Sequence, residues 1–444
     1  MKRKVKKRKF NVEKTQKLFC FSSFVFLATC CLWYGGRFLY FYLENEKRLD
    51  ESRPTVTKNL TQTIINNSEL KKINDTKYFY NDANNNYIKY SNITWRILKI
   101  DNEDTIYLIS DNVLTILSNG NDNYINKWLN KSKEDYTGIL EKNLNNTSKY
   151  LTSYNVCDDE INDLKNIQCN KVNKNNTIGL LSIIDYINTG GEKSFINNQK
   201  YTYLNNKNSN NQLWYINDQG KLGTSTEENI YGLKPVIRLN SNIEVISGNG
   251  TSNNPYIIEK DSSLFGSYVK LNNDIWRIYD VANENIKLIL NDYLTEDEQK
   301  VYQKYSNNNY YHNDTIYQSL AYYLNNTYLN TLTYKNNINN SKWANFHYSI
   351  DNNFNYQEVL KNQIDTKISV PSIGDIILND NNKENFFTNT GTNNKDGMIY
   401  TINKNGTLTK KNVTYNSNIV PCININKNIL TKGNGTLENP YEME

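Results

Sequence analysis

Few side chains in this 444-residue chain could do covalent or metal chemistry. Its two histidines, His312 and His347, both lie in the second half of the chain. Among six cysteines, Cys157 and Cys169 are close enough to form one short disulfide in an oxidising compartment, or to remain two free thiols. No cysteine spacing is typical of a zinc site or a disulfide scaffold. We therefore predict no catalytic residue, no cofactor and no metal, and we expect a protein that is not an enzyme.

Tyrosine and asparagine are both abundant. The chain has 35 tyrosines, and exposed aromatic side chains can stack on sugars or anchor protein partners. Asparagine favours turns because its amide bonds nearby backbone and it tolerates left-handed geometry. The asparagine-rich segments 84–86, 205–211 and 307–309 are therefore predicted to be loops between strands.

The N-terminal segment combines a basic tail with an apolar stretch. Residues 1–17 contain nine Lys or Arg residues and one acid, and residues 18–43 are apolar apart from Arg37. About 20 apolar residues cross a bilayer, and basic residues stay on the cytoplasmic side. The pattern predicts a cytoplasmic tail (1–17), a transmembrane signal-anchor helix (18–43) and a polar stalk (44–76), with the remainder outside the cell membrane. Because the basic run adjoins this helix, we expect no nucleic-acid partner; lipidation at Cys30 remains an alternative to the uncleaved anchor.

The rest of the chain contains an internal repeat. Six blocks recur in the same order, offset by 180 to 195 residues; Trp95-Arg96, for example, recurs as Trp276-Arg277, and Pro235 as Pro421. We name residues 77–260 repeat 1 and residues 261–444 repeat 2, and we expect each to fold as a domain.

Each repeat is predicted to open with a hairpin. Apolar residues alternate at Ile93, Trp95 and Ile97, and a polar turn at 101–104 leads to a second strand at 106–109; repeat 2 has its turn at 282–285. Helices are predicted at 128–144 and 182–188, and in repeat 2 at 316–332 and 372–379. Strands at 213–217 and 236–239 close the first copy. Helices inserted among short antiparallel strands predict an α+β class.

The order of these blocks resembles a family of bacterial surface domains of unknown function. The matching motifs in repeat 1 are 93–98 (I-x-W-R-V-L type), 128–130 (W-L-N), 180–182 (L-L-S), 215–222 (Y-V-N-x-D-G-S-L) and 232–236 (G-V-R-P). That family is similar to the C-type-lectin-like fold of formylglycine-generating enzymes, so the resemblance implies two tandem lectin-like domains. Where the family has W-W-L-R-S-P, this chain has Tyr203-Leu204-Asn205-Asn206, without the arginine. Repeat 2 also replaces the glycine and arginine near Pro421, with Asn418 and Val420.

The repeated residues have structural explanations. Neighbours on a strand point to opposite faces, so Trp95 and Trp276 are expected in the core, with Arg96 and Arg277 in structural pairs. Asp185 and Asp375 would each lie in the first turn of a helix, where the dipole favours an acid. The repeated Gly-Asn-Gly-Thr segments at 248–251 and 433–436 lack the Lys-Ser/Thr of a phosphate loop and are predicted to be turns.

These observations favour a bacterial cell-surface binding or adhesion protein whose ligand is a glycan or a surface protein. Tyr203, Trp214 and Tyr215 are the predicted ligand-binding residues, in the repeat that keeps most of the family pattern. The alternative is an envelope-assembly protein without a specific ligand. An enzyme is the third possibility.

Overall fold

The computed structural model describes residues 33, 36, 37, 40, 58–118, 123–133, 137–165, 167–225, 229–260, 263–296, 299–300, 302–304, 319–344, 346–347, 363–378, 386–391, 398–403 and 407–443. The chain divides into two compact units, residues 1–56 and 57–444. Both repeats belong to the second unit.

The chain is mostly sheet, with 40% strand and 16% helix, so the predicted α+β class is wrong. Within the described ranges, no helix is long and apolar enough to cross a membrane. The predicted basic tail, the Cys30 alternative and nearly all of segment 18–43 lie outside those ranges. Of that segment only Trp33, Gly36, Arg37 and Tyr40 are described.

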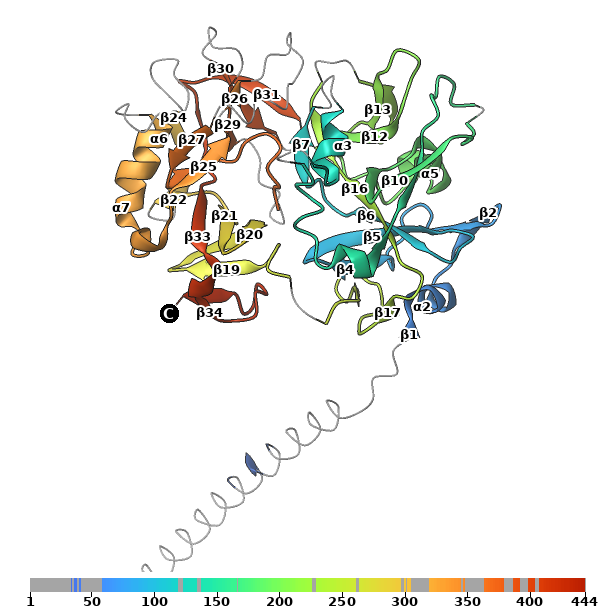
Figure 1. Ribbon diagram of the computed structural model, residues 1–444, viewed down its shortest axis with the longest axis horizontal. Coiled ribbons are helices and arrows are strands. Elements are labelled where there is room, and N and C mark those ends of the chain that lie inside the picture. The colour runs from blue at the N-terminus through green and yellow to red at the C-terminus, as the bar shows by residue number, and fades with distance from the viewer. Residues whose placement is uncertain are drawn as a thin grey trace, which may run out of the picture. The chain divides into compact units, whose positions relative to one another are not determined.

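The main sheet of repeat 1 is built around the predicted hairpin (Figure 1). β5 (Ile93–Ile100) pairs antiparallel with β6 (Ile106–Ser110), which confirms that hairpin. The order continues from β6 through β16 (Pro235–Leu239) to β11 (Ile178–Leu180), and on the other side β5 pairs with β4 (Tyr87–Tyr90) and β3 (Thr76–Tyr78). β18 (Tyr256–Ile257) returns from the end of the repeat to pair parallel with β4.

A second sheet of repeat 1 carries the remaining strands in the order β14, β13, β12, β15 and β7. Their bounds are β7 Thr115–Leu117, β12 Thr202–Lys207, β13 Leu213–Ile216, β14 Leu222–Thr224 and β15 Tyr231–Leu233. β9 (Tyr154–Cys157) and β10 (Val172–Asn176) form a separate hairpin. Segment 205–211 is therefore not a loop throughout, because β12 extends to Lys207.

Repeat 2 shares the central strand order of repeat 1 but lacks counterparts of β2, β3 and β8 among its described strands. Its main sheet runs β28, β33, β21, β20, β19, β35 and β34, and its second sheet runs β24, β32, β29, β30 and β31. The bounds are β19 Tyr268–Leu271, β20 Asp274–Ala282, β21 Asn285–Leu290, β24 Tyr302–Lys304, β28 Ile368–Ser369, β29 Phe386–Gly391, β30 Met398–Ile402, β31 Leu408–Asn412, β32 Asn416–Asn418, β33 Cys422–Asn426, β34 Leu430–Lys432 and β35 Tyr441–Met443. A separate antiparallel pair is formed by β25 (Ser341–Ala344) and β27 (Gln363–Thr366).

The helices are shorter than the sequence pattern predicts. α3 (Tyr124–Leu129) ends at Asn130, whose amide nitrogen turns back to the Asn126 side chain at 2.9 Å and also binds the Ile178 carbonyl at 2.9 Å. Helix 128–144 is therefore wrong beyond its first residues. α5 (Ile183–Asn188) is confirmed, with Ser182 as its N-cap accepting a hydrogen bond from the Asp185 backbone at 3.1 Å. In repeat 2 the helical stretch comprises α6 (Leu320–Tyr322), the π-helical η2 (Tyr323–Tyr328) and α7 (Leu329–Thr331).

The second helix predicted in repeat 2 is absent over its described part, residues 372–378. This segment instead lies along β7 of repeat 1: the Gly374 and Ile377 amides donate to the carbonyls of Ile116 and Leu114 at 3.2 and 2.8 Å. Trp128 adds a bond from its indole nitrogen to the Gly374 carbonyl at 2.7 Å. The segment forms no helix because its backbone groups find partners in the neighbouring repeat.

One hydrophobic core runs through both repeats. It includes Trp95, Trp128, Trp276 and Ile376, and a smaller core in repeat 1 contains Tyr186 and Trp214 among others. The two predicted domains are therefore packed into one unit.

The described part of the predicted stalk also belongs to this unit. α2 (Leu60–Asn67) buries Leu60 and Ile64 completely, and β1 (Lys58–Asn59) pairs with β17 (Glu244–Val245). β2 (Lys71–Ile73) pairs with β3 and extends the main sheet of repeat 1. Residues 58–76, which the sequence pattern assigns to a stalk, therefore belong to the folded unit.

Candidate functional site

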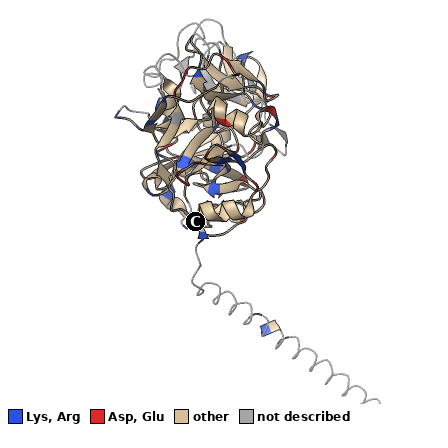
Figure 2. Cartoon of the chain, turned by 90° about the vertical axis from the view of Figure 1, so that its right-hand side faces the viewer, with Lys and Arg blue, Asp and Glu red and all other residues tan. Residues whose placement is uncertain are grey.

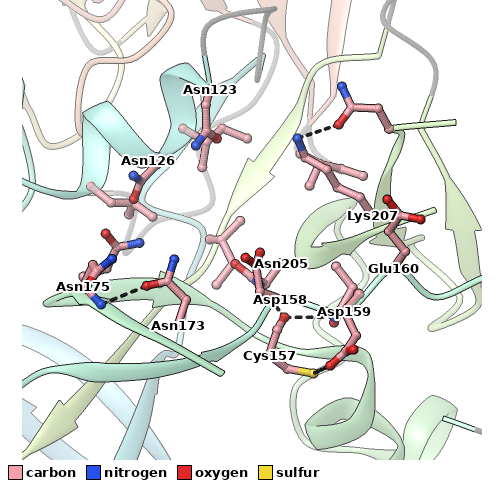
Figure 3. A pocket seen from close by; sticks show the side chains of 18 of the residues that line it. Asn123, Asn126, Cys157, Asp158, Asp159, Glu160, Asn173, Asn175, Asn205 and Lys207 are labelled. Carbon is pink, nitrogen blue, oxygen red and sulfur yellow. Dashed lines mark hydrogen bonds between the residues drawn. The ribbon is translucent and has the colours of Figure 1, made fainter. Parts of the chain in front are cut away.

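A polar pocket of about 520 Å³ lies in repeat 1 between α3, the β9–β10 hairpin and the β12–β13 hairpin (Figure 3). Asparagine is the commonest residue in its lining, three acids lie along one wall, and few apolar side chains contribute. The polar lining residues are Asn123, Asn126, Asp158, Asp159, Glu160, Asn173, Asn175, Asn176, Asn205, Asn206, Lys207, Asn208 and Asn211.

The acidic wall, residues 157–160, is fixed at its base by a disulfide. Cys157 and Cys169 are bonded across the end of the β9–β10 hairpin, with their Cα atoms 5.6 Å apart. One carboxylate oxygen of Asp159 accepts hydrogen bonds from the Asn170 and Lys171 amides at 2.7 and 2.8 Å. The Asp158 amide in turn donates to the Lys171 carbonyl at 2.9 Å. These bonds hold the wall in one conformation without using the carboxylates of Asp158 and Glu160.

Two asparagines of β12 attach this wall to the second sheet. The amide nitrogens of Asn205 and Asn206 both donate to the Cys157 carbonyl, at 3.0 and 3.1 Å. The Asn206 oxygen accepts from the Ile183 amide at 3.0 Å, so its buried amide joins the wall to the start of α5. Asn205 and Asn206 lie in the segment that aligns with the W-W-L-R-S-P motif, where the arginine is absent from this chain. The two side-chain amides serve here as structural hydrogen-bonding groups.

Several polar side chains in the pocket keep free hydrogen-bonding capacity. Among the described residues, none forms a hydrogen bond with the side chains of Asn123, Asn175, Asn176, Asp158 or Glu160. The one lysine of the lining, Lys207, donates to the Asn211 amide oxygen at 2.8 Å (Figure 3). The pocket therefore presents amides and carboxylates, which donate and accept hydrogen bonds at neutral pH.

Metal binding competes with the disulfide at this site. Over the described part of the chain, one group of three potential ligand residues comes together: Cys157, Asp159 and Cys169, with ligand atoms within 4.8 Å of one another. Both sulfurs are in the disulfide, whereas metal binding by cysteine requires thiolates. We assign no metal to the group.

The three predicted ligand-binding residues do not share a surface. Tyr203 and Tyr215 are paired across β12 and β13, and Tyr215 is partly exposed. Trp214 points to the other face, where it is 9% exposed in the smaller core and donates to the Ile161 carbonyl at 2.9 Å. Adjacent residues of a strand point to opposite faces, so alternation separates Trp214 from Tyr215, but the sequence does not show which of the two faces is buried.

The repeated Trp-Arg pairs lie in the main sheets. Trp95 and Trp276 are fully buried. Arg96 binds the Asn86 amide oxygen at 2.7 Å and lies 3.9 Å from the Tyr87 ring, and Arg277 binds the Gly266 carbonyl at 2.8 Å. Burial lowers the pKa of both guanidinium groups. Neither arginine lines the pocket.

The repeated prolines and the lysine beside one of them are also structural. Pro235 begins β16, and Pro421 directly precedes β33, accepting a hydrogen bond from the Leu290 amide at 3.0 Å. Lys234 occupies the arginine position of the G-V-R-P motif and is 3% exposed, with its ammonium 3.1 Å from the Ile196 carbonyl. Burial lowers the pKa of Lys234 to about 8, and the negative charge of Asp111 acts in the opposite direction.

The sequence pattern does not predict Asp158 and Glu160 as site residues, although both lie among asparagines in the pocket. The pocket residues come from segments far apart along the chain, namely residues 157–160, β10 and β12. Asparagine in a sequence indicates loops, so it does not point to a shared site. The useful signal was Cys157 and Cys169, because a disulfide brackets the acidic wall.

No protein-family model, curated protein or solved structure matches this chain. The resemblance to bacterial surface domains therefore stays a prediction, and the pocket of repeat 1 is the feature that bears on function.

Proposed function

We propose that this protein is a cell-surface binding protein and that the pocket of repeat 1 binds a carbohydrate. The observation that carries the proposal is a cavity of about 520 Å³ lined mainly by amides and carboxylates, several of which have no hydrogen-bond partner among the described residues. Sugar hydroxyls both donate and accept hydrogen bonds, and amides and carboxylates provide the complementary groups.

The arrangement of charge favours recognition by short-range contacts. Basic and acidic residues are interspersed over the described part of the chain in Figure 2. The pocket itself has one lysine against three acids. A ligand that carries several negative charges would meet repulsion there, whereas an uncharged sugar would not.

The predicted cell-membrane location belongs to the same proposal and rests on the sequence of residues 1–43. Protease added to intact cells should remove most of the chain and leave the basic tail protected. Protection of the C-terminal part instead would contradict this location.

The ligand proposal is tested with a glycan array and isothermal titration calorimetry on the full chain. Asn175→Ala removes an exposed amide of the pocket and should weaken sugar binding about tenfold, the order of one hydrogen bond. The matched control is Asn253→Ala, at an exposed turn outside the lining, which should bind as the natural chain does. Absence of sugar binding, together with capture of envelope proteins alone, would overturn the proposal in favour of the assembly alternative.

A further inference from the structure

Four tyrosines gather on the second sheet of repeat 1. Tyr201, Tyr203, Tyr215 and Tyr231 come from the start of β12, from β13 and from β15. The Tyr231 ring is stacked on Tyr201 at a centroid distance of 5.2 Å, and it lies 4.7 Å from Tyr215 and 5.2 Å from Tyr203. Tyr203 and Tyr231 are buried, and Tyr201 and Tyr215 remain partly exposed. The buried pair thus supports two rings that reach the surface.

A glycine fixes where the Tyr215 ring lies. Gly223 of β14 is the cross-strand partner of Tyr215. A Cβ atom at Gly223 would lie 2.7 Å from the ring and hydroxyl of Tyr215, closer than side chains tolerate. The ring therefore lies across β14 because that position has no side chain. Alanine at Gly223 would move the ring without removing it.

The tyrosine cluster continues the pocket along the same face of the hairpin. Leu213 lines the pocket, and Tyr215 is two residues further along β13. Residues i and i+2 of a strand project from one face, with their Cα atoms about 7 Å apart. That spacing is of the order of one sugar ring, so a chain of sugars held in the pocket could reach the tyrosines.

Repeat 2 differs from repeat 1 at two of the four tyrosine positions, those of Tyr215 and Tyr231. Its pairing places Thr401 where repeat 1 has Tyr215 and Thr409 where it has Gly223. Ser417, next to Asn418 of β32, takes the position of Tyr231 next to Gly232. The equivalent strands therefore form without the rings of Tyr215 and Tyr231, so the fold does not require these two tyrosines.

We infer that Tyr201 and Tyr215 form a second subsite of the proposed carbohydrate site, which stacks on a sugar ring one or two units away from the pocket. Aromatic rings suit the apolar face of a sugar, and their hydroxyl rims suit its edge. The inference rests on the proposed function and adds that the ligand is an oligosaccharide.

The test compares ligand length. The affinities of glucose, galactose, mannose and N-acetylglucosamine are measured by calorimetry, each as the single sugar and as its oligomers of two to four units. In the natural chain, the oligomers of the bound sugar should bind more tightly than the single unit. Tyr215→Ala should weaken oligomer binding about tenfold and leave the single sugar unchanged.

Two further variants keep the test informative if Tyr215→Ala unfolds. Gly223→Ala should reduce the preference for oligomers while keeping every tyrosine, and Tyr215→Phe should retain most of it. Thr401→Ala, the equivalent position in repeat 2, should have no effect. If Gly223→Ala and Tyr215→Ala leave the length preference intact, the subsite is overturned and the pocket stands. If no sugar of any length binds the natural chain, the proposed function falls, and the subsite falls with it.

Discussion

Both repeats carry the same asparagine contact after the first hairpin, but among the described residues the pocket lined by amides and acids lies in repeat 1. Asn130 donates to the Ile178 carbonyl at 2.9 Å and accepts from its amide at 2.9 Å. Asn325 makes the same two bonds to Ile368, at 2.9 and 3.0 Å. The contact fixes the helix to the edge strand of the main sheet, so it belongs to the fold.

The two repeats differ in side chains that are not required to form the strands they share. Repeat 1 has a disulfide at the end of its β9–β10 hairpin, whereas Cys422, the one cysteine of repeat 2, is buried in β33 and is not disulfide-bonded. Repeat 1 also has an ion pair of Arg238 with Asp101 at 2.8 Å, and the position of Arg238 is taken by Asn424 in repeat 2. A duplicated framework can thus keep its backbone contacts while one copy acquires a site.

The largest effect should come from the paired core tryptophans. Trp95→Ala and Trp276→Ala should each lower the free energy of unfolding by about 3–5 kcal/mol, because each leaves a large cavity. Since one core runs through both repeats, denaturant unfolding should stay a single transition in both variants. Two transitions, of which only the mutated repeat's moves, would show that the repeats are energetically independent.

Removing the disulfide of repeat 1 should destabilise the whole folded unit, because the two repeats share one core. Cys157→Ser with Cys169→Ser should cost about 3 kcal/mol, the scale expected for a short closed loop, and should weaken sugar binding because the acidic wall loosens. Chemical denaturation with and without a reductant measures this. Reductant should reproduce the loss in the natural chain and do nothing further to the double variant. Unchanged stability would mean that the hydrogen bonds of Asp159 hold the wall by themselves.

The shared asparagine contact should be worth the same in both repeats. Asn130→Ala and Asn325→Ala each remove the pair of hydrogen bonds to Ile178 or Ile368, at about 1–3 kcal/mol, and Asn130→Ala also removes the bond from the Thr177 amide. Melting curves of the two variants should shift by similar amounts. A loss in only one of them would show that the two contacts are not equivalent.

The smallest expected effect is a loss of folding stability at acidic pH that arises from Asp101 in repeat 1. Burial acts to raise the pKa of Asp101, but hydrogen bonds from Thr105 and the charge of Arg238 bring it below its ordinary value. The ionised form is favoured in the folded state, so this stabilisation is present above pH about 4 and is lost as the pH falls below it. Asp101→Asn should flatten the acid limb of a stability–pH curve. An unchanged limb would assign acid sensitivity to other carboxyls.

Sequence alternation predicted the local strands well. The pattern at Ile93, Trp95 and Ile97 gave the first hairpin, and Ser182 with Asp185 gave the start of α5. Both depend on near neighbours along the chain: strand periodicity in the first case and a cap in the second. Repeated blocks such as Trp95-Arg96 and Trp276-Arg277 likewise lie at equivalent strands, β5 and β20, because the side-chain requirements of one backbone recur when the backbone recurs.

Only the tertiary structure decided the features that depend on distant partners. Segment 372–378 has a helix-like pattern, yet it extends along β7 of repeat 1, where its amides find carbonyl partners. Helix 128–144 fails because the Asn130 side chain ends it by binding β11. The pocket joins Cys157, Asn175 and Asn205 from three separate segments, and the pairing of β12 with β13 puts Tyr215 beside the site and Trp214 in the core. The local sequence sets how side chains alternate along a strand. Which of the two faces is buried depends on the free energy gained by packing against partner segments, and only the tertiary structure supplies those partners.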